Sequence, residues 1–385
     1  MSYLAPYLQG GLAHFLWVVF WFLVVLTVLV FIHELGHYLI ARRNGVKIEV
    51  FSIGFGPELY GWWDRAGTRW KFSAIPLGGY VKMFGDSDAT SGLPATQPAQ
   101  LTAAEREVSF HCKRLGQRAA IVAGGPIANF VFAIVALALL FMTYGQPFTP
   151  ADVGQVLPGS AAEQGGIHPG DAIASIDGQS IDRFEDVQQI VRLNPSVPLT
   201  IVVKRDGEPV TLHVTPSRVE ESDRLGRREV GQLGIRGGAP KYVRRDPASA
   251  VVRAAGETWN LSATTLEAMW QMVIGRRTTD ELGGPLRIAQ LSGEVAQGGI
   301  VPLIWFMSVL SVNLGLINLF PVPVLDGGHL LFYAAEAIRG RPLGQRAQEY
   351  GFRIGLALVL TLMVFATWND LVHIGILDLV KRFVT

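Results

Sequence analysis

The chain of 385 residues carries 33 Lys and Arg against 32 Asp and Glu, so it has no basic surplus with which to bind nucleic acid. Only 17% of the residues are charged and 49% are hydrophobic, a composition that indicates a protein with several membrane-spanning helices. The single cysteine, Cys112, excludes an internal disulfide and any metal site built from several cysteines.

The first apolar segment covers about residues 12–41 and is predicted to be a transmembrane helix. No Lys or Arg precedes it, whereas Arg42 and Arg43 follow it directly, so the positive-inside rule places its end in the cytoplasm and the N-terminus on the opposite side of the membrane. The segment has no basic start and no small-residue cleavage site before residue 33. We therefore expect a retained helix and not a signal peptide.

This helix ends with the sequence Phe31-Ile32-His33-Glu34-Leu35-Gly36-His37. His33 and His37 are four residues apart, so a helix places both imidazoles on one face together with Glu34. Two imidazoles at this spacing suit Zn²⁺, and the adjacent carboxylate can act as a general base. The pattern predicts metal-assisted hydrolysis. The alternative is a pair of histidines that extend toward the lipid headgroups, although ionisable residues within apolar spans usually mark function.

Residues 47–84 alternate in short runs punctuated by glycine, which predicts β-hairpins. Three tryptophans, at positions 62, 63 and 70, favour the membrane interface and a sheet that dips toward the metal site. The pattern alone leaves a surface hairpin unrelated to catalysis equally open. Residues 85–114 are expected to form a loose cytoplasmic loop, and a second span follows at about residues 119–144.

A soluble domain is predicted at residues 150–237. Its stretch from Pro158 to Ile173, followed by Ile176-Asp177-Gly178, resembles a PDZ domain of the permuted kind found in bacterial proteases. Leu233, Gly234 and Ile235 are candidates for the loop that receives a peptide terminus, with a plain strand end as the alternative. Residues 238–299 are predicted to be a periplasmic linker that contains an amphipathic helix lying on the membrane.

The third span, residues 301–324, is interrupted at Pro321 and Pro323, just before Asp326. Irregular backbone at membrane depth must be buried in protein or line a cavity, so Asp326 is a strong candidate for the third metal ligand. His329 is its rival, because imidazole also suits zinc. A basic loop is predicted at residues 325–353, and a last span at residues 354–377 exits on the outer face of the membrane.

Taken together, these motifs resemble the site-2 protease family of intramembrane zinc metalloproteases, bacterial RseP type, over nearly the whole chain. The resemblance is carried by the His33–His37 motif, Gly-Pro-x-x-Asn at residues 125–129, one PDZ domain, and Asn318-Leu319-Phe320-Pro321-Val322-Pro323-Val324-Leu325-Asp326-Gly327-Gly328. The best-known members of this type carry two PDZ domains, whereas here only one is predicted.

The resemblance implies His33, His37 and Asp326 as zinc ligands and Glu34 as the general base. Asn313 and Asn318 are amides in an apolar span, so they either bond to neighbouring helices or hold the backbone of a substrate. The resemblance implies that they hold the substrate, and we predict that Pro321 and Pro323 of the same motif contribute to that binding. The stretch at residues 47–84 would be a membrane re-entrant β structure that pairs with the substrate.

The predicted fold is a polytopic α-helical membrane protein with four transmembrane helices, a membrane-associated β-hairpin region and one inserted periplasmic PDZ domain. The predicted location is the bacterial inner membrane, in contact with lipid, and the predicted substrates are single-span membrane proteins such as anti-sigma factors, cleaved in stress-response signalling. One alternative is a PDZ-bearing membrane scaffold or quality-control receptor with a degenerate metal site. The other is a membrane zinc protease that acts on soluble loops.

Overall fold

The structure is a computed structural model that describes residues 5–85, 101–181, 183–223, 226–238, 241–275, 283–341 and 343–374. The chain divides into two compact units. The helical unit comprises Met1–Ala138, Val251–Met269 and Thr278–Thr385. The strand-rich unit comprises Leu139–Ala250 and Trp270–Arg277.

Among the described residues, four helices are long and apolar enough to cross a membrane: α1 (Ala5–Arg43), α3 (Leu115–Thr143), α8 (Ile300–Leu319) and α10 (Gln345–Ile374). These are the four apolar helices that the hydropathy predicts, so the protein is membrane-integral. Their bounds differ from the prediction. The first helix begins earlier, because it continues to Ala5 across a kink at Gly11, and α10 begins nine residues before position 354.

Two strands follow α1: β1 (Ile48–Trp63) and β2 (Arg69–Met83). Each strand bends, and glycines with positive φ occur in both, at Gly54 (91°) and Gly78 (128°). Because of the bends, each strand contributes two segments to one sheet. The pairing places the four segments in the order 79–82, 50–53, 69–72, 58–63.

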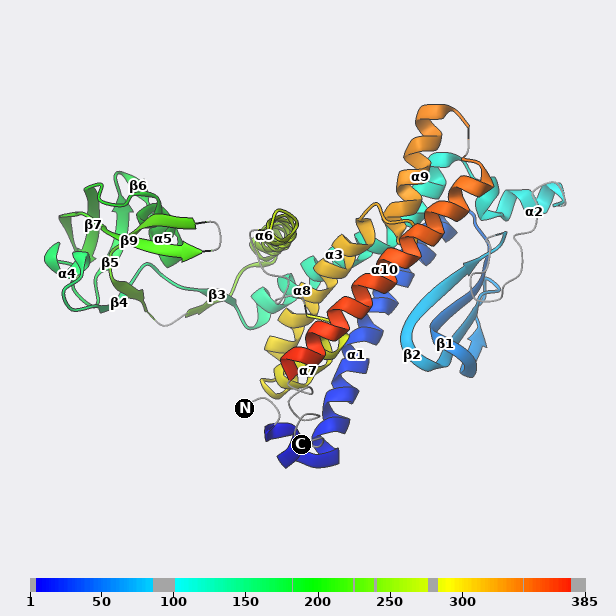
Figure 1. Cartoon of the computed structure of the whole chain (residues 1–385), viewed down its shortest axis with the longest axis horizontal. Coiled ribbons are helices and arrows are strands. Elements are labelled where there is room, and N and C mark those ends of the chain that lie inside the picture. Colours follow the sequence, from blue (N-terminus) through cyan, green and yellow to red (C-terminus); the bar gives the residue numbers. More distant parts are fainter. Residues whose placement is uncertain are drawn as a thin grey trace. The chain divides into compact units, whose positions relative to one another are not determined.

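This sheet packs against α1 (Figure 1). Phe51 of the sheet and Ile121 of α3 are fully buried, and Tyr38 of α1 is 5% exposed in the same core cluster. Met83, at the end of β2, is buried in the same cluster. The aromatic and β-branched side chains of the sheet therefore pack against apolar side chains of α1, and this packing holds the sheet beside the helix that carries His33 and His37.

Several helices lie where loops were expected. In the segment 325–353, α9 (Asp326–Arg339) forms and ends at Gly340, whose φ is 68°, so the expectation of a basic loop there is wrong for those residues. Similarly, α2 (Ala103–Val108) and the short η2 (Phe110–Cys112) lie within the predicted loop 85–114, of which residues 86–100 are outside the described residues. Hydropathy misses α9 because only one of its faces is apolar, and it misses α2 and η2 because they are only six and three residues long.

Between β12 (Lys241–Val243) and α8, the described part of the chain contains two helices. The first, α6 (Pro247–Val273), covers most of the predicted amphipathic helix. The second, α7 (Pro285–Gln297), was not predicted, and it contacts α1, α8 and α10. Gly293 allows its close packing on α1, because a Cβ at this position would lie 2.6 Å from Cγ2 of Val18.

The strand-rich unit is built around a four-stranded sheet with the order β6-β5-β7-β8. Its strands and helices are β3 (Gln146–Phe148), β4 (Val153–Val156), α4 (Ala161–Gln164), β5 (Ala172–Ile176), β6 (Gln179–Ser180), α5 (Phe184–Leu193), β7 (Leu199–Arg205), β8 (Glu208–Val214), β9 (Ser217–Asp223), β10 (Gly226–Gln232), β11 (Ile235–Gly237) and β12 (Lys241–Val243). Ile201 and Val203 of the central strand are fully buried, and Val187 of α5 packs on them in one core. The unit therefore has a hydrophobic core of its own.

Candidate metal centre

The two motif histidines lie on α1 at a point where this helix closely approaches α3. Gly36 lies between them in sequence, and a Cβ there would come within 2.2 Å of the carbonyl oxygen of Gly124 and 2.6 Å of Cβ of Ala128. Glycine is therefore required for this helix contact. The contact brings α3 beside His33 and His37 and shields both rings, each 11% exposed.

Asp326 is the first residue of α9, and it follows a non-helical stretch after α8. Gly327 and Gly328 allow α9 to begin directly against this stretch. A Cβ on Gly327 would lie 2.2 Å from the carbonyl oxygen of Leu319, and one on Gly328 would lie 2.4 Å from that of Val322. The break and the paired glycines thus turn the chain so that Asp326 faces α1.

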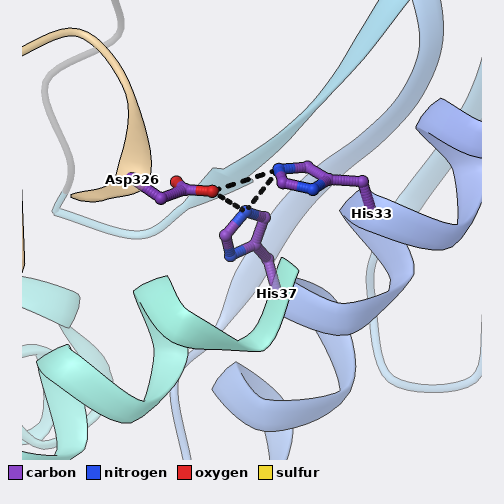
Figure 2. A group of neighbouring side chains, drawn as sticks. All are labelled: His33, His37 and Asp326. Atoms are coloured by element: carbon purple, nitrogen blue, oxygen red, sulfur yellow. Dashed lines mark hydrogen bonds and ion pairs between the residues drawn. The ribbon is translucent and has the colours of Figure 1, made fainter. Parts of the chain in front are cut away.

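The structure brings His33, His37 and Asp326 together, although 289 or more positions separate the aspartate from the histidines in sequence (Figure 2). Nε2 of His33 lies 3.2 Å from Oδ2 of Asp326, and Nε2 of His37 lies 3.4 Å from the same oxygen. The two Nε2 atoms are 3.2 Å apart. All three ligand-type atoms therefore point at one common centre.

This donor set fits a metal ion. Ligands bonded to zinc at about 2.0–2.1 Å in a tetrahedron stand ~3.3 Å apart, close to the three separations observed. Nδ1 of His37 lies 2.9 Å from the carbonyl oxygen of Ile121, and donating there leaves the Nε2 lone pair for the metal. Oδ2 of Asp326 is buried, and apart from the Nε2 atoms of His33 and His37 it has no polar partner among the described residues. A bound cation would satisfy it together with both nitrogens.

A cavity of about 340 Å³ extends from this centre. Glu34, His37 and Asp326 line it together with Val81 and Met83 from the sheet. Glu34 is therefore accessible from the cavity but belongs to no ligand group that the structure describes, as expected of a base that acts on water beside a metal. His329, the rival ligand, lies on the cavity wall outside the group of three.

The residues predicted to hold the substrate lie on α8 and on the break that follows it. Oδ1 of Asn313 accepts a hydrogen bond of 3.0 Å from the hydroxyl of Thr265 on α6. Asn318 is half-buried in the last turn of α8. Pro321 is exposed and Pro323 is half-buried. These four side chains are not among the residues that line the cavity at the metal centre.

The candidate peptide-binding loop lies in the strand-rich unit. Leu233 is buried, and Ile235 pairs with Val156 of β4. Gly234 has a φ of 78°, and a Cβ there would lie 2.3 Å from Cβ of Ser160. The loop forms one wall of a groove of about 490 Å³, and α5 forms another with Val187.

Asn129 of α3 is a residue of the centre whose role the sequence did not reveal. It is fully buried, and its amide lies 3.1 Å from Nδ1 of His33. Its place in the Gly-Pro-x-x-Asn motif was the available signal, but helical periodicity cannot pair residues on different helices.

A family model described as Peptidase family M50 matches residues 21–362 of the chain. The chain belongs to this family. A protein of Rhizobium meliloti named as a zinc metalloprotease is 49% identical over 91% of this chain and 95% of its own length. Metalloprotease MmpA of Caulobacter vibrioides is 40% identical, with coverage of 91% and 94%. A relative from Rickettsia conorii, also named as a zinc metalloprotease, is 36% identical, with coverage of 91% and 97%.

Membership in the M50 family confirms the predicted resemblance to site-2 proteases. The chain is a metalloendopeptidase whose cofactor is zinc. The scaffold interpretation required a degenerate metal site, whereas this M50 protein keeps both histidines, the glutamate and the aspartate, with the three ligand-type residues grouped in space.

Proposed function

We propose that this M50 protein hydrolyses a peptide bond within or near the transmembrane segment of single-span membrane proteins. The observation that carries the proposal is the position of the catalytic motif. His33, Glu34 and His37 lie inside a 33-residue apolar helix, Gly11–Arg43, and not on a soluble domain. Ionisable residues at such a position are costly and are retained for function.

In this proposal, His33, His37 and Asp326 hold the zinc ion. When bound, zinc polarises the scissile carbonyl and lowers the pKa of water. Glu34 accepts a proton from the water molecule that attacks the carbonyl carbon and then passes it to the leaving amine as the C–N bond breaks. One water is consumed, and the products are a new carboxylate and a new amine. The buried setting of the centre strengthens these electrostatic interactions.

A transmembrane helix buries its peptide bonds in its own hydrogen bonds, so the substrate must be unwound before attack. The sheet offers an edge for the extended chain. Segment 79–82 is an outer segment of the sheet, and a Cβ on Gly79 would lie only 3.2 Å from Cγ of Glu34. We therefore assign this edge the role of pairing with the unwound substrate by β-augmentation. Asn313, Asn318, Pro321 and Pro323 would hold the substrate beyond the cut.

We further assign the strand-rich unit as a single PDZ domain of an RseP-type protease. In this assignment the unit lies in the periplasm, as do both termini, and the protein resides in the bacterial inner membrane. The groove lined by Leu233, Gly234 and Ile235 supports a binding role for the unit, because a strand, a loop and a helix meet there as peptide-binding grooves require. Substrates of the anti-sigma-factor type would be cleaved after loss of their outer domain, in a stress-response pathway.

The proposal is tested by purified wild type, Glu34→Gln and Asp326→Ala, each assayed for zinc content and for cleavage of a single-span substrate. We expect one zinc per chain in wild type and in Glu34→Gln. Loss of the base should lower kcat by at least about 10²-fold. Asp326→Ala should lose both zinc and activity. Chelation of the metal should abolish wild-type cleavage, and added Zn²⁺ should restore it.

Two results would contradict the proposal. Cleavage that survives Glu34→Gln would exclude Glu34 as the base. Cleavage only of soluble loops, with the transmembrane segment left intact, would favour a membrane zinc protease that acts outside the bilayer.

A further inference from the structure

Asp64 lies directly after β1, in the turn that leads into β2, and its carboxylate accepts four hydrogen bonds. Oδ1 accepts from the backbone N–H groups of Ala66 (2.8 Å) and Thr68 (2.9 Å). Oδ2 accepts from the hydroxyl of Tyr38 (2.8 Å) and from the indole nitrogen of Trp70 (3.1 Å). One oxygen thus closes the turn, and the other joins the turn to α1.

A cation reinforces the second oxygen. Nη1 of Arg42 donates to the hydroxyl of Tyr38 at 2.7 Å and lies 3.7 Å from Oδ2 of Asp64. Burial by itself would raise the pKa of Asp64, but the hydrogen bonds from Thr68, Trp70, Tyr38 and Ala66 outweigh it and lower the pKa to about 2. The carboxylate is therefore charged at neutral pH, and its hydrogen bonds to Tyr38 and Trp70 are of the stronger, charge-assisted kind.

Tyr38 follows His37 directly on α1, so this contact ties the sheet to the helix beside the metal centre. Aromatic packing extends the attachment into the sheet. The rings of Trp70 and Phe51 are stacked with centroids 4.2 Å apart, and the Tyr38 ring meets both edge-on, at 5.1 Å from Trp70 and 5.6 Å from Phe51. Trp70 lies in segment 69–72, which pairs with 50–53, which in turn pairs with the edge 79–82.

The sheet touches α1 at a second place, where Gly79 meets Val30 and Glu34. A Cβ on Gly79 would lie 3.0 Å from Cγ1 of Val30. Glu34 and Tyr38 are four residues apart, which is about 6 Å along the helix. With contacts at two points along α1, the sheet is restrained against sliding along the helix and against pivoting on it.

We propose that Asp64 is a positioning residue that, through Tyr38, sets edge segment 79–82 against Glu34 and so fixes the register of the bound substrate relative to the metal centre. The substrate part of this inference rests on the proposed pairing of the edge with the unwound chain. The structural part, that Oδ2 of Asp64 holds the sheet on α1, does not depend on it. Asp64 touches no substrate atom and is not itself catalytic.

Tyr38→Phe is the most selective variant, because it deletes one hydroxyl and leaves the ring packing and the hydrogen bonds of Oδ1 in place. Tyr60→Phe is the matched control. Like Tyr38→Phe, it removes one tyrosine hydroxyl, but Tyr60 lies in the sheet and its side chain is 66% exposed. Asp64→Asn tests the acceptor itself, since it removes the charge at nearly constant volume.

The experiment uses the full-length zinc-loaded protein and has two readouts. In the first, spin labels at Arg43→Cys and Arg65→Cys, both exposed positions, report the distance between α1 and the turn in a Cys112→Ser background. In the second, unlabelled Tyr38→Phe, Asp64→Asn and Tyr60→Phe are assayed for KM and kcat on a single-span substrate and for zinc content.

We expect Tyr38→Phe and Asp64→Asn to broaden the distance distribution and to raise KM about tenfold, with kcat within about twofold and zinc unchanged. Tyr60→Phe should match wild type in both readouts. A merely structural role would lower the yield of folded protein without a selective rise in KM.

An unchanged distance distribution together with an unchanged KM overturns the inference. A broadened distribution with an unchanged KM also overturns it, because the sheet position would then have no bearing on the substrate. If the wild type cleaves no single-span substrate, the proposed function fails, while the distance readout still reports whether Asp64 holds the sheet.

Discussion

At the scale of single residues, the orientation of His33 depends on Asn129. When Nε2 of His33 faces the metal centre, its Nδ1 carries the hydrogen and needs an acceptor. The amide of Asn129 stands 3.1 Å away, and its Oδ1 is buried without a hydrogen-bond partner among the described residues. With the amide turned so that this oxygen faces His33, both groups are satisfied at once. Asn129 thus does for His33 what the carbonyl oxygen of Ile121 does for His37.

Asn129→Ala is expected to weaken zinc binding by about 10- to 100-fold, because the ring of His33 loses the group that orients it. Asn129→Asp, which keeps an acceptor oxygen, should retain most of the affinity. Competition with a chelator of known zinc affinity measures both variants in detergent. Equal zinc affinity in wild type and Asn129→Ala would remove Asn129 from the centre.

Individual residues also show how far sequence reasoning reaches. The spacing of His33 and His37 predicts a shared helix face from local geometry alone, and the structure places both rings on one side of α1. Asp326 emerged from the break at Pro321 and Pro323 together with family resemblance. No local rule could give its separations of 3.2 and 3.4 Å from the two rings, because these depend on how α9 packs against α1.

At the scale of elements, helices α1, α3 and α9 meet at the metal centre through close approaches, and an ion pair joins α3 to α9. Glycine at position 125 lets α3 pass beside the imidazoles, since a Cβ there would lie 2.3 Å from Nε2 of His37 and 2.8 Å from Cε1 of His33. On α9, Glu336 accepts a hydrogen bond of 2.6 Å from Arg118 of α3, whose guanidinium lies 4.9 Å from the centroid of the Tyr333 ring. These contacts hold the helix that carries Asp326 next to the helix that covers the histidines.

Gly125→Ala is expected to lower zinc affinity at least tenfold while the protein stays folded, because the added methyl displaces the two rings and not the helix backbone. Gly116→Ala on the same helix is the control. Apart from its chain neighbours and the nearby backbone of its own helix, no heavy atom lies within 4 Å of the added Cβ. Zinc titration and the thermal midpoint of each variant measure the two effects. A similar zinc affinity for both variants would show that the rings can adapt to the methyl.

The elements that sequence analysis missed share one physical property. Helices α7 and α9 have one apolar face each. A hydropathy window averages the apolar and polar faces of such a helix, so its mean value resembles that of a loop. The order of segments in the sheet was equally out of reach. Alternation predicts strands, but the pairing of 50–53 with both 79–82 and 69–72 depends on bends in β1 and β2.

At the scale of the whole molecule, the candidate catalytic and metal-binding residues belong to a different unit from the strands of residues 146–243. His33, Glu34, His37 and Asp326 all belong to the helical unit. The strand-rich unit, with its own buried core at Ile201 and Val203, supplies none of these residues. The metal centre therefore does not depend on that unit for a ligand.

Replacing residues 150–237 by a flexible linker is expected to leave one zinc per chain, because no ligand is lost. If the unit filters substrates, the deletion should also bring the cleavage rate of a full-length substrate close to that of a substrate whose outer domain has been removed. Cleavage rates of the two substrates by the wild type and by the deletion variant provide the measurement. An unchanged ratio of rates would refute the filter, and loss of zinc would refute the independence of the two units.

Hydropathy and helical periodicity are local properties of the chain, so the four apolar helices and the face shared by His33, Glu34 and His37 could be predicted without any structure. The distant groups that complete the centre could be identified only from the packing of the folded chain. The positions of Asp326 and Asn129 beside the histidines, and of Asp64 beside Tyr38, follow from packing of helices and sheet around glycines. Such contacts are set by the shape of two surfaces at once, which no single stretch of sequence contains.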